Sequence, residues 1–258
     1  MSGRYVAVGS SMAAGPGIKP GVPDAPSRSG RSQRNYPQLV ADRLGYELVD
    51  VTFSGATTAN LLTEPQRGAP PQLDALDGSE DLVTVTIAGN DVGYLPLLLV
   101  AGLPRFSRHV PLFGRIVRDL SDPEARNLAL TQAAESLKAV GREVRRRAPN
   151  ARILFVDYLT LLPPHGTPAP PLFDPYVELA RHIAETLAHI TAEAAADSGC
   201  DLVRASEASR DHHAWSDDPW TTGFAFPWPG RVPLHPNAAG MRAVAELVVA
   251  ELAVDRLS

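Results

Sequence analysis

The chain has 258 residues, of which 44% are hydrophobic and 21% are charged, so it has enough apolar side chains to bury the core of a globular domain. Its net charge of −5 excludes a broadly basic surface of the kind that binds nucleic acids or anionic membranes. Its one cysteine, Cys200, excludes a disulfide within the chain.

The first residues lack the charged and apolar segments of a secretory leader. The densest apolar patch, residues 95–100, is far shorter than the ~18 residues of a membrane span. We therefore expect a cytoplasmic protein that has no membrane span and no nucleic-acid partner.

Five β-rich runs alternate along the chain with segments of helical periodicity. The expected strands are residues 5–8, 47–52, 82–88, 152–158 and 201–204. The expected helices are residues 36–44, 124–148, 175–198 and 237–257. Within residues 124–148 the apolar positions recur every three or four residues, which is typical of a helix with one buried face: Leu130, Ala133, Leu137, Val140 and Val144.

Strands that alternate with helices predict right-handed crossovers and a parallel sheet that helices cover on both faces. The expected fold class is α/β, a three-layer α/β/α sandwich with a five-stranded parallel sheet, formed as one domain over residues 1–258. We expect four long irregular connections at the carboxyl edge of the sheet, where loops usually carry function: residues 15–35, 90–123, 159–174 and 205–234.

Four candidate residues stand at this same edge. Ser11 follows the first strand in a turn that begins with a glycine, and Gly55 follows the second strand. Asn90 follows the third strand in a Gly-Asn-Asp turn, and His235 precedes the last helix. A serine hydroxyl is a weak nucleophile near neutral pH, and an imidazole can accept its proton and return it later. These residue types therefore indicate nucleophilic catalysis.

The order of these blocks resembles the SGNH (GDSL-like) hydrolase superfamily, and in particular its actinobacterial esterase and lipase branch. Residues 35–37 and 235–241 add supporting matches. The resemblance implies a flavodoxin-like fold, with Ser11 as the nucleophile and His235 as the general base. It also implies an oxyanion hole formed by the backbone N–H groups of Ser11 and Gly55 and the side-chain amide of Asn90. No cofactor is implied.

The sequence departs from the family pattern at two positions. Ser10 stands where the family usually has an aspartate, and Val232 stands where the aspartate that orients the histidine belongs. We expect the backbone carbonyl of Val232 to accept a hydrogen bond from the His235 ring, which would give a Ser-His dyad. A carboxylate from the loop before His235 is the alternative: Asp211, Asp217 or Asp218.

Apolar and aromatic residues flank the predicted site and suggest a channel for an acyl chain: Tyr94, Leu97, Phe106, Phe226 and Trp228. We therefore expect a serine esterase that acts on short- to medium-chain esters, with a small-molecule ester as its partner. Sugar O-acetylesterase and thioesterase activity are alternatives. A binding module with the same fold and decayed catalysis is an alternative of another class. The sequence does not reveal the oligomeric state.

Overall fold

The computed structural model describes residues 2–104, 111–225 and 232–254. Its centre is a five-stranded sheet in the order β2-β1-β3-β4-β5, and every neighbouring pair of strands is parallel. This order is that of flavodoxin-like folds, so the predicted fold class is confirmed. The strands are β1 (Arg4–Gly9), β2 (Glu47–Asp50), β3 (Leu82–Thr86), β4 (Arg152–Val156) and β5 (Asp201–Val203).

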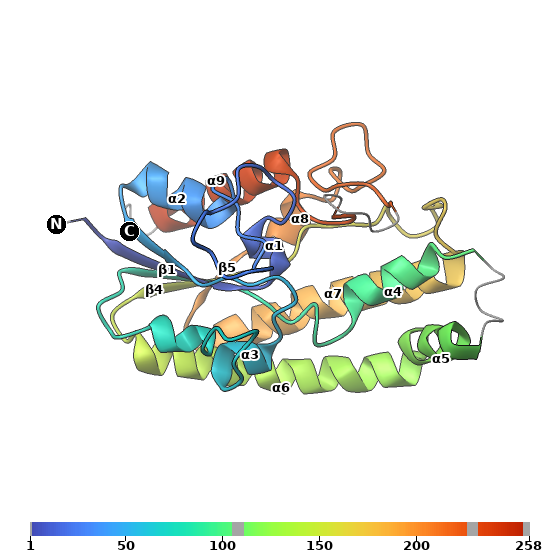
Figure 1. Ribbon diagram of the computed structural model, residues 1–258, viewed down its shortest axis with the longest axis horizontal. Coiled ribbons are helices and arrows are strands. Elements are labelled where there is room, and N and C mark those ends of the chain that lie inside the picture. The colour runs from blue at the N-terminus through green and yellow to red at the C-terminus, as the bar shows by residue number, and fades with distance from the viewer. Residues whose placement is uncertain (1, 105–110, 226–231, 255–258) are drawn as a thin grey trace.

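Helices cover both faces of the sheet (Figure 1). One face packs against α2 (Tyr36–Leu44) and α9 (Ala238–Val254), and the short helix α1 (Ser11–Ala14) begins on this side. The other face packs against α3 (Thr58–Leu62), α6 (Pro123–Arg147) and α7 (Asp174–Asp197). The remaining short elements are η1 (Gln72–Ala75) and α8 (Ala205–Ala208).

The predicted long helices agree closely with the observed ones. The five apolar positions predicted for the buried face of α6 are all buried. The predicted first strand stops one residue short of the observed carboxyl end of β1, and the other four predicted strands run past the observed ends by one to two residues, because the chain turns away from the sheet there. After β3, for example, Ala88 has a φ of +86°, which no strand residue adopts.

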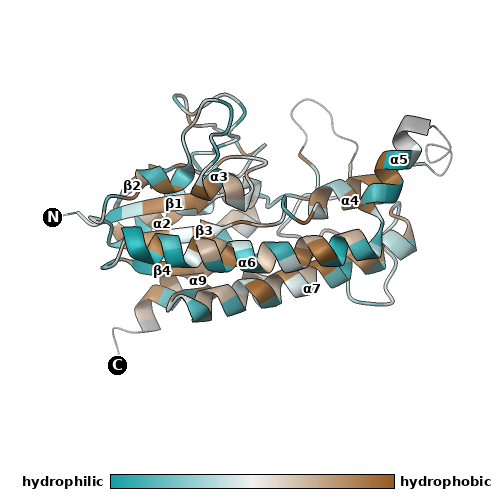
Figure 2. Ribbon diagram, turned by 90° about the horizontal axis from the view of Figure 1, so that it is seen from below, coloured by the Kyte–Doolittle hydropathy of each residue, from teal (hydrophilic) through white to brown (hydrophobic). Residues whose placement is uncertain are grey.

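The connection 90–123 was expected to be irregular, and this expectation is wrong. It contains α4 (Tyr94–Ala101) and α5 (Pro111–Leu120). Pro96 is compatible with α4 because it lies in the first helical turn, where a backbone N–H would have no intrahelical acceptor. Figure 2 shows both helices beside the same end of α6 and α7. Within the described ranges, no helix is both long and apolar enough to cross a membrane.

Candidate active site

The turn after β1 places Ser11 between β1 and β3, where the strand order reverses and where open α/β sheets bind their ligands. Gly9 ends the strand with a φ of +154°, and a Cβ atom there would lie 2.5 Å from the carbonyl oxygen of Thr86. Only glycine fits this close approach. Ser10 then donates its N–H to the Thr86 carbonyl at 2.9 Å. Ser11, the first residue of α1, is 5% exposed.

A buried glutamine holds this turn from the other side. The N–H of Gly9 donates to Oε1 of Gln72 at 2.7 Å, and Nε2 of Gln72 donates to the Gly9 carbonyl at 3.0 Å. The same carbonyl accepts the N–H of Phe53 at 2.9 Å. The Gln72 side-chain amide therefore supplies hydrogen bonds to the last residue of β1, at a point that lies past the end of β2. The sequence carries no local signal for this role, because Gln72 lies in a short 3₁₀ helix far from the motif.

Replacement of Gln72 by leucine is expected to lower the free energy of unfolding by about 1–3 kcal/mol, because a buried backbone N–H loses its acceptor. We also expect a lower kcat with a smaller change in KM, since the turn that carries Ser11 loses a restraint. Denaturant unfolding and ester kinetics would measure both. Gln38→Leu on α2 is the matched control, because within the described residues its side-chain amide bonds only to Asp42. Equal effects at both positions would contradict the role of Gln72.

His235 meets Ser11 across 224 residues of sequence. Its Nε2 lies 2.9 Å from Oγ of Ser11, and its Nδ1 lies 2.8 Å from the carbonyl oxygen of Pro233. A carbonyl can only accept a hydrogen bond, so Nδ1 carries the proton and Nε2 is free to accept the serine hydrogen. Leu234 has a φ of +56°, and this left-handed turn brings the Pro233 carbonyl back to the ring.

The expected partner of the ring, the carbonyl of Val232, is therefore wrong by one residue. That carbonyl instead accepts the hydroxyl of Thr222 at 2.8 Å. Thr222 also donates its N–H to the carbonyl of His235 at 2.8 Å, and its Oγ1 accepts the N–H of His235 at 3.1 Å. The left-handed turn at Leu234, which sequence patterns do not predict for a leucine, selects Pro233 as the acceptor.

The carboxylates considered as alternatives lie elsewhere. Asp218 contacts the ring of His212, with 3.4 Å between Nδ1 and the carboxylate, and Asp217 and Asp211 are exposed. Within the described part of the chain, the ring nitrogens of His235 bond to Pro233 and Ser11 and to none of these carboxylates. The ring is therefore oriented by a neutral acceptor.

The environment of His235 favours the neutral imidazole. Burial lowers the pKa of His235 below its usual 6.5, and the hydrogen bond to the Pro233 carbonyl opposes this shift only in part. A nearby carboxylate would have raised the pKa instead. The ring is thus unprotonated at neutral pH, as a general base must be.

The pH profile of ester hydrolysis is expected to follow from this direction. If His235 acts as the general base, only its neutral form is active, so kcat/KM should rise with pH and level off below the range expected for a free histidine, with a midpoint under pH 6.5. Initial rates between pH 4 and 9 would measure the midpoint, and tryptophan fluorescence at each pH would show that the protein stays folded. A midpoint at or above pH 7 would contradict a carbonyl-supported ring.

The segments after β2 and β3 are joined to each other at the carboxyl edge of the sheet. Gly55 has a φ of +80° and an exposed backbone, and the next residue, Ala56, accepts the side-chain amide of Asn90 at 2.8 Å. Asp91 accepts the N–H of Thr58 at 3.0 Å and its hydroxyl at 2.5 Å, so it caps the start of α3. The predicted Asn90-Asp91 turn therefore fixes the loop that carries Gly55.

Tyr158, after β4, connects the same loops to the serine turn. Its hydroxyl lies 2.9 Å from Oγ of Ser10 and accepts the N–H of Gly89 at 3.1 Å. Burial raises the pKa of Tyr158 to about 12, so the phenol stays protonated. Ser10, which stands in place of the family aspartate, is fully buried. Its hydroxyl bonds to the neutral Tyr158 hydroxyl, and this bond links the serine turn to the segment after β4.

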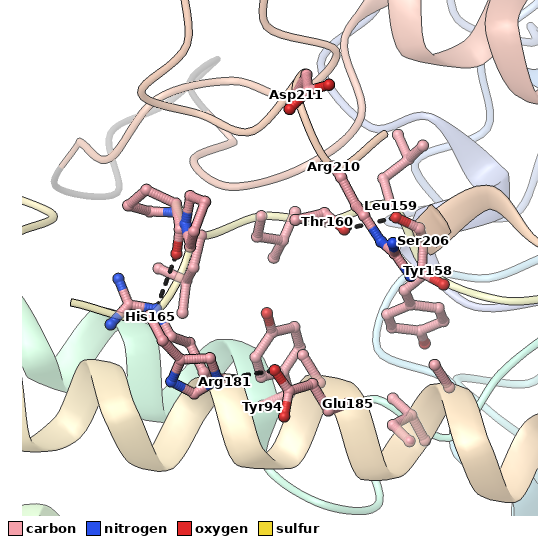
Figure 3. A pocket seen from close by; sticks show the side chains of 17 residues that line it. Tyr94, Tyr158, Leu159, Thr160, His165, Arg181, Glu185, Ser206, Arg210 and Asp211 are labelled. Carbon is pink, nitrogen blue, oxygen red and sulfur yellow. Dashed lines mark hydrogen bonds and ion pairs between the residues drawn. The ribbon is translucent and has the colours of Figure 1, made fainter. Parts of the chain in front are cut away.

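The residues predicted to contact an acyl chain are only partly described. Tyr94 lines a cavity of about 620 Å³ (Figure 3). Leu97 is fully buried in the hydrophobic core and is not among the residues that line this cavity, so its contact with an acyl chain stays a prediction. Phe106, Phe226 and Trp228 lie outside the described residues. Among the residues that are described, no group of three or more His, Cys, Asp or Glu side chains is arranged to hold a metal ion.

A serine hydrogen-bonded to a neutral histidine, at the strand-order reversal of an α/β/α sandwich, defines the class of the serine hydrolases. The comparison with known families agrees. The chain belongs to the GDSL-like Lipase/Acylhydrolase family, whose family model matches residues 7–243, and it is a carboxylic ester hydrolase.

Relatives from Streptomyces resemble the chain over nearly its whole length. "Lipase 2" of Streptomyces coelicolor is 34% identical over 261 residues, which cover 97% of this chain and 86% of the relative. The crystal structure of an extracellular lipase from Streptomyces rimosus has a TM-score of 0.78 at 24% identity and covers 98% of this chain and 100% of that one. Phospholipase A1 from Streptomyces albidoflavus NA297 has a TM-score of 0.76 at 22% identity, covering 97% and 100%. These two structures share the fold.

Proposed function

We propose that the chain is an esterase that hydrolyses short- to medium-chain acyl esters through a covalent acyl-enzyme on Ser11, with His235 as general base in a Ser-His dyad. One observation carries the proposal. The Ser11 hydroxyl and the His235 Nε2 are 2.9 Å apart, and Nδ1 is tied to a carbonyl that holds the required tautomer. Hydrogen-bond reach between nucleophile and base is the geometry that activates a serine.

The reaction has two halves. Oγ of Ser11 attacks the ester carbonyl while Nε2 of His235 takes the hydroxyl proton, and the resulting tetrahedral oxyanion collapses when the imidazolium gives that proton to the departing alcohol. Water then attacks the acyl-Ser11 carbonyl, with His235 as base again, and the acid leaves with Ser11 restored. No step requires a group beyond these side chains, the ester and water.

The oxyanion is proposed to accept hydrogen bonds from the N–H groups of Ser11 and Gly55 and from the amide of Asn90. The Ser11 N–H lies at the start of α1, where backbone N–H groups have no intrahelical acceptor. Asn90 has two amide hydrogens, and the bond to Ala56 uses one of them. Gly55 has no side chain to obstruct the approach. Preorganised donors of this kind are each worth about 10²–10³ in rate in other acyl-transfer enzymes.

The experiment that tests the proposal is labelling with a fluorophosphonate, followed by hydrolysis of p-nitrophenyl esters from acetate to decanoate. One label on the peptide that contains Ser11, with highest kcat/KM between acetate and octanoate, is expected. No label and no hydrolysis would favour the binding module instead. Hydrolysis that is strong only on acetylated sugars or on acyl thioesters would move the substrate class to those alternatives.

The cytoplasmic location stays a prediction. Its support is the single cysteine, Cys200, which has no partner for a disulfide within the chain. The lipase of Streptomyces rimosus is described as extracellular. Cell fractionation of the producing organism would distinguish the two locations.

A further inference from the structure

The residues after β2, 53–56, form a tight turn that fixes the direction of one peptide group. The Phe53 carbonyl accepts the N–H of Ala56 at 3.0 Å, and Gly55, the third residue of the turn, has a φ of +80°. This is the φ of the third residue in a type II turn, whose central peptide is rotated by about half a turn from its direction in a type I turn. The direction of the Ser54–Gly55 peptide therefore distinguishes the two turns.

The two polar groups of that peptide point in opposite directions, because the peptide is planar and trans. The Ser54 carbonyl accepts the side-chain amide of Gln66, with 3.1 Å between the oxygen and Nε2. The N–H of Gly55 bonds to no acceptor among the described residues, and Gly55 is exposed. The contact with Gln66 therefore leaves the Gly55 N–H available to a ligand on the opposite side of the peptide.

Gln66 is held by a hairpin of its own, in the chain between α3 and η1. Gln66 and Ala69 exchange two backbone hydrogen bonds of 2.9 Å across a two-residue loop. The loop residues, Arg67 and Gly68, have φ values of +50° and +85°, and positive φ at both central residues is typical of a type I′ turn. The backbone of Gln66 is therefore fixed, and its side chain reaches back 12 residues to Ser54.

Only one half of the Gln66 amide has a partner. Nε2 must face the Ser54 carbonyl, because Oε1 cannot donate a hydrogen. Oε1 is buried and makes no hydrogen bond within the described part of the chain. An unpaired buried acceptor is destabilising, so it offsets what the bond from Nε2 contributes to stability. Stability of the fold therefore does not account for this amide, whereas the direction of the Ser54–Gly55 peptide does.

We propose that Gln66 is a positioning residue for ester hydrolysis, whose amide holds the Ser54–Gly55 peptide so that the Gly55 N–H points at the oxyanion. The inference rests on the proposed function, in which this N–H is one of the oxyanion donors. Without Gln66, rotation of the peptide toward the type I direction would turn the N–H away and bring the Ser54 carbonyl oxygen toward the negative charge. Only the transition state carries that charge, so Gln66 acts on kcat rather than on binding of the ester.

Gln66→Met tests the inference, because methionine keeps the length of the side chain and loses the amide donor. We expect kcat/KM for p-nitrophenyl butyrate to fall about 10–10²-fold with KM nearly unchanged, a smaller loss than complete removal of one oxyanion donor causes. Gln66→Glu, which has the same shape and no donor when ionised, should lose at least as much. Gln132→Met, at an exposed position of α6, is the matched control and should leave the rate unchanged.

Affinity for a transition-state analogue distinguishes positioning from a merely structural role. In an alkyl trifluoromethyl ketone, Oγ of Ser11 adds to the carbonyl carbon, the carbonyl electron pair moves onto oxygen, and His235 takes the serine proton. The inhibition constant of this ketone should rise in Gln66→Met by the factor by which kcat/KM falls. The corresponding secondary alcohol forms no oxyanion and should bind both proteins equally. The melting temperature should change little, because Oε1 of Gln66 has no described partner to lose.

Several results would overturn the inference. Gln66→Met and Gln66→Glu could both keep kcat/KM within about twofold, or lose activity with unchanged affinity for the trifluoromethyl ketone. Equal loss of affinity for the ketone and the alcohol, or unfolding of both variants at the assay temperature, would make the amide structural. If the unmodified protein hydrolyses esters and is labelled at Ser11 while both variants match it, this inference alone fails. If the unmodified protein shows neither hydrolysis nor label, the proposed function fails and the inference with it.

Discussion

Ser11→Ala is expected to lower kcat/KM for p-nitrophenyl esters by about 10⁴-fold or more, because the proposed covalent route needs the serine oxygen and a methyl group cannot replace it. The substitution removes one hydroxyl from a residue that is 5% exposed, and the fold should remain intact. Initial rates on the purified variant, with circular dichroism and a melting curve beside the unmodified protein, would measure both parts of this expectation.

Ser10→Ala is the matched control, since it makes the same change one residue earlier. Ser10 bonds to the Tyr158 hydroxyl, and among the described residues the hydrogen bond to the His235 ring comes from Ser11 instead, so loss of the Ser10 hydroxyl should reduce the rate by tenfold at most. If Ser10→Ala were inactive and Ser11→Ala active, the nucleophile would be Ser10 and the assignment of Ser11 would be wrong. If both retained activity, the acyl-enzyme on this turn would be ruled out.

The sequence was sufficient to predict that Ser11 and His235 meet. Both stand next to regular elements whose periodicity is strong, β1 and α9, and parallel strands bring all their carboxyl ends to one edge. The same reasoning placed Asn90 and Gly55 there, and the bond between Asn90 and Ala56 joins their loops. Prediction therefore worked where position depends on topology.

Prediction failed where position depends on single backbone angles or on distant side chains. The choice between the carbonyls of Val232 and Pro233 depends on the left-handed turn at Leu234, a conformation that L-residues rarely adopt. Gln72 bonds to backbone 63 residues away, and Thr222 bonds across a loop to backbone 10 and 13 residues away, and no local pattern marks either residue. α4 was missed because Gly93 and Pro96 resemble helix breakers when only composition is considered.

His235→Ala is expected to lower kcat by about 10³-fold, while Asp217→Asn and Asp218→Asn should each leave it within about twofold. In the proposed mechanism the imidazole takes the proton from Ser11, so without it the hydroxyl must attack unaided. In serine-protease triads, neutralising the aspartate that orients the histidine lowers kcat by about 10⁴-fold. Here the Pro233 carbonyl occupies that position at 2.8 Å, so neutral asparagine at the two aspartates changes nothing that the ring contacts.

Thr222→Val separates orientation from proton transfer in the same experiment. Valine keeps the shape of the side chain and removes the hydroxyl that bonds to the Val232 carbonyl and to the N–H of His235. We expect a kcat about tenfold lower with KM nearly unchanged, because the loop that holds the ring loses two restraints while the base itself remains. A large loss in Asp217→Asn or Asp218→Asn would instead mean that a carboxylate reaches the ring during turnover, and the dyad would have to be replaced by a triad.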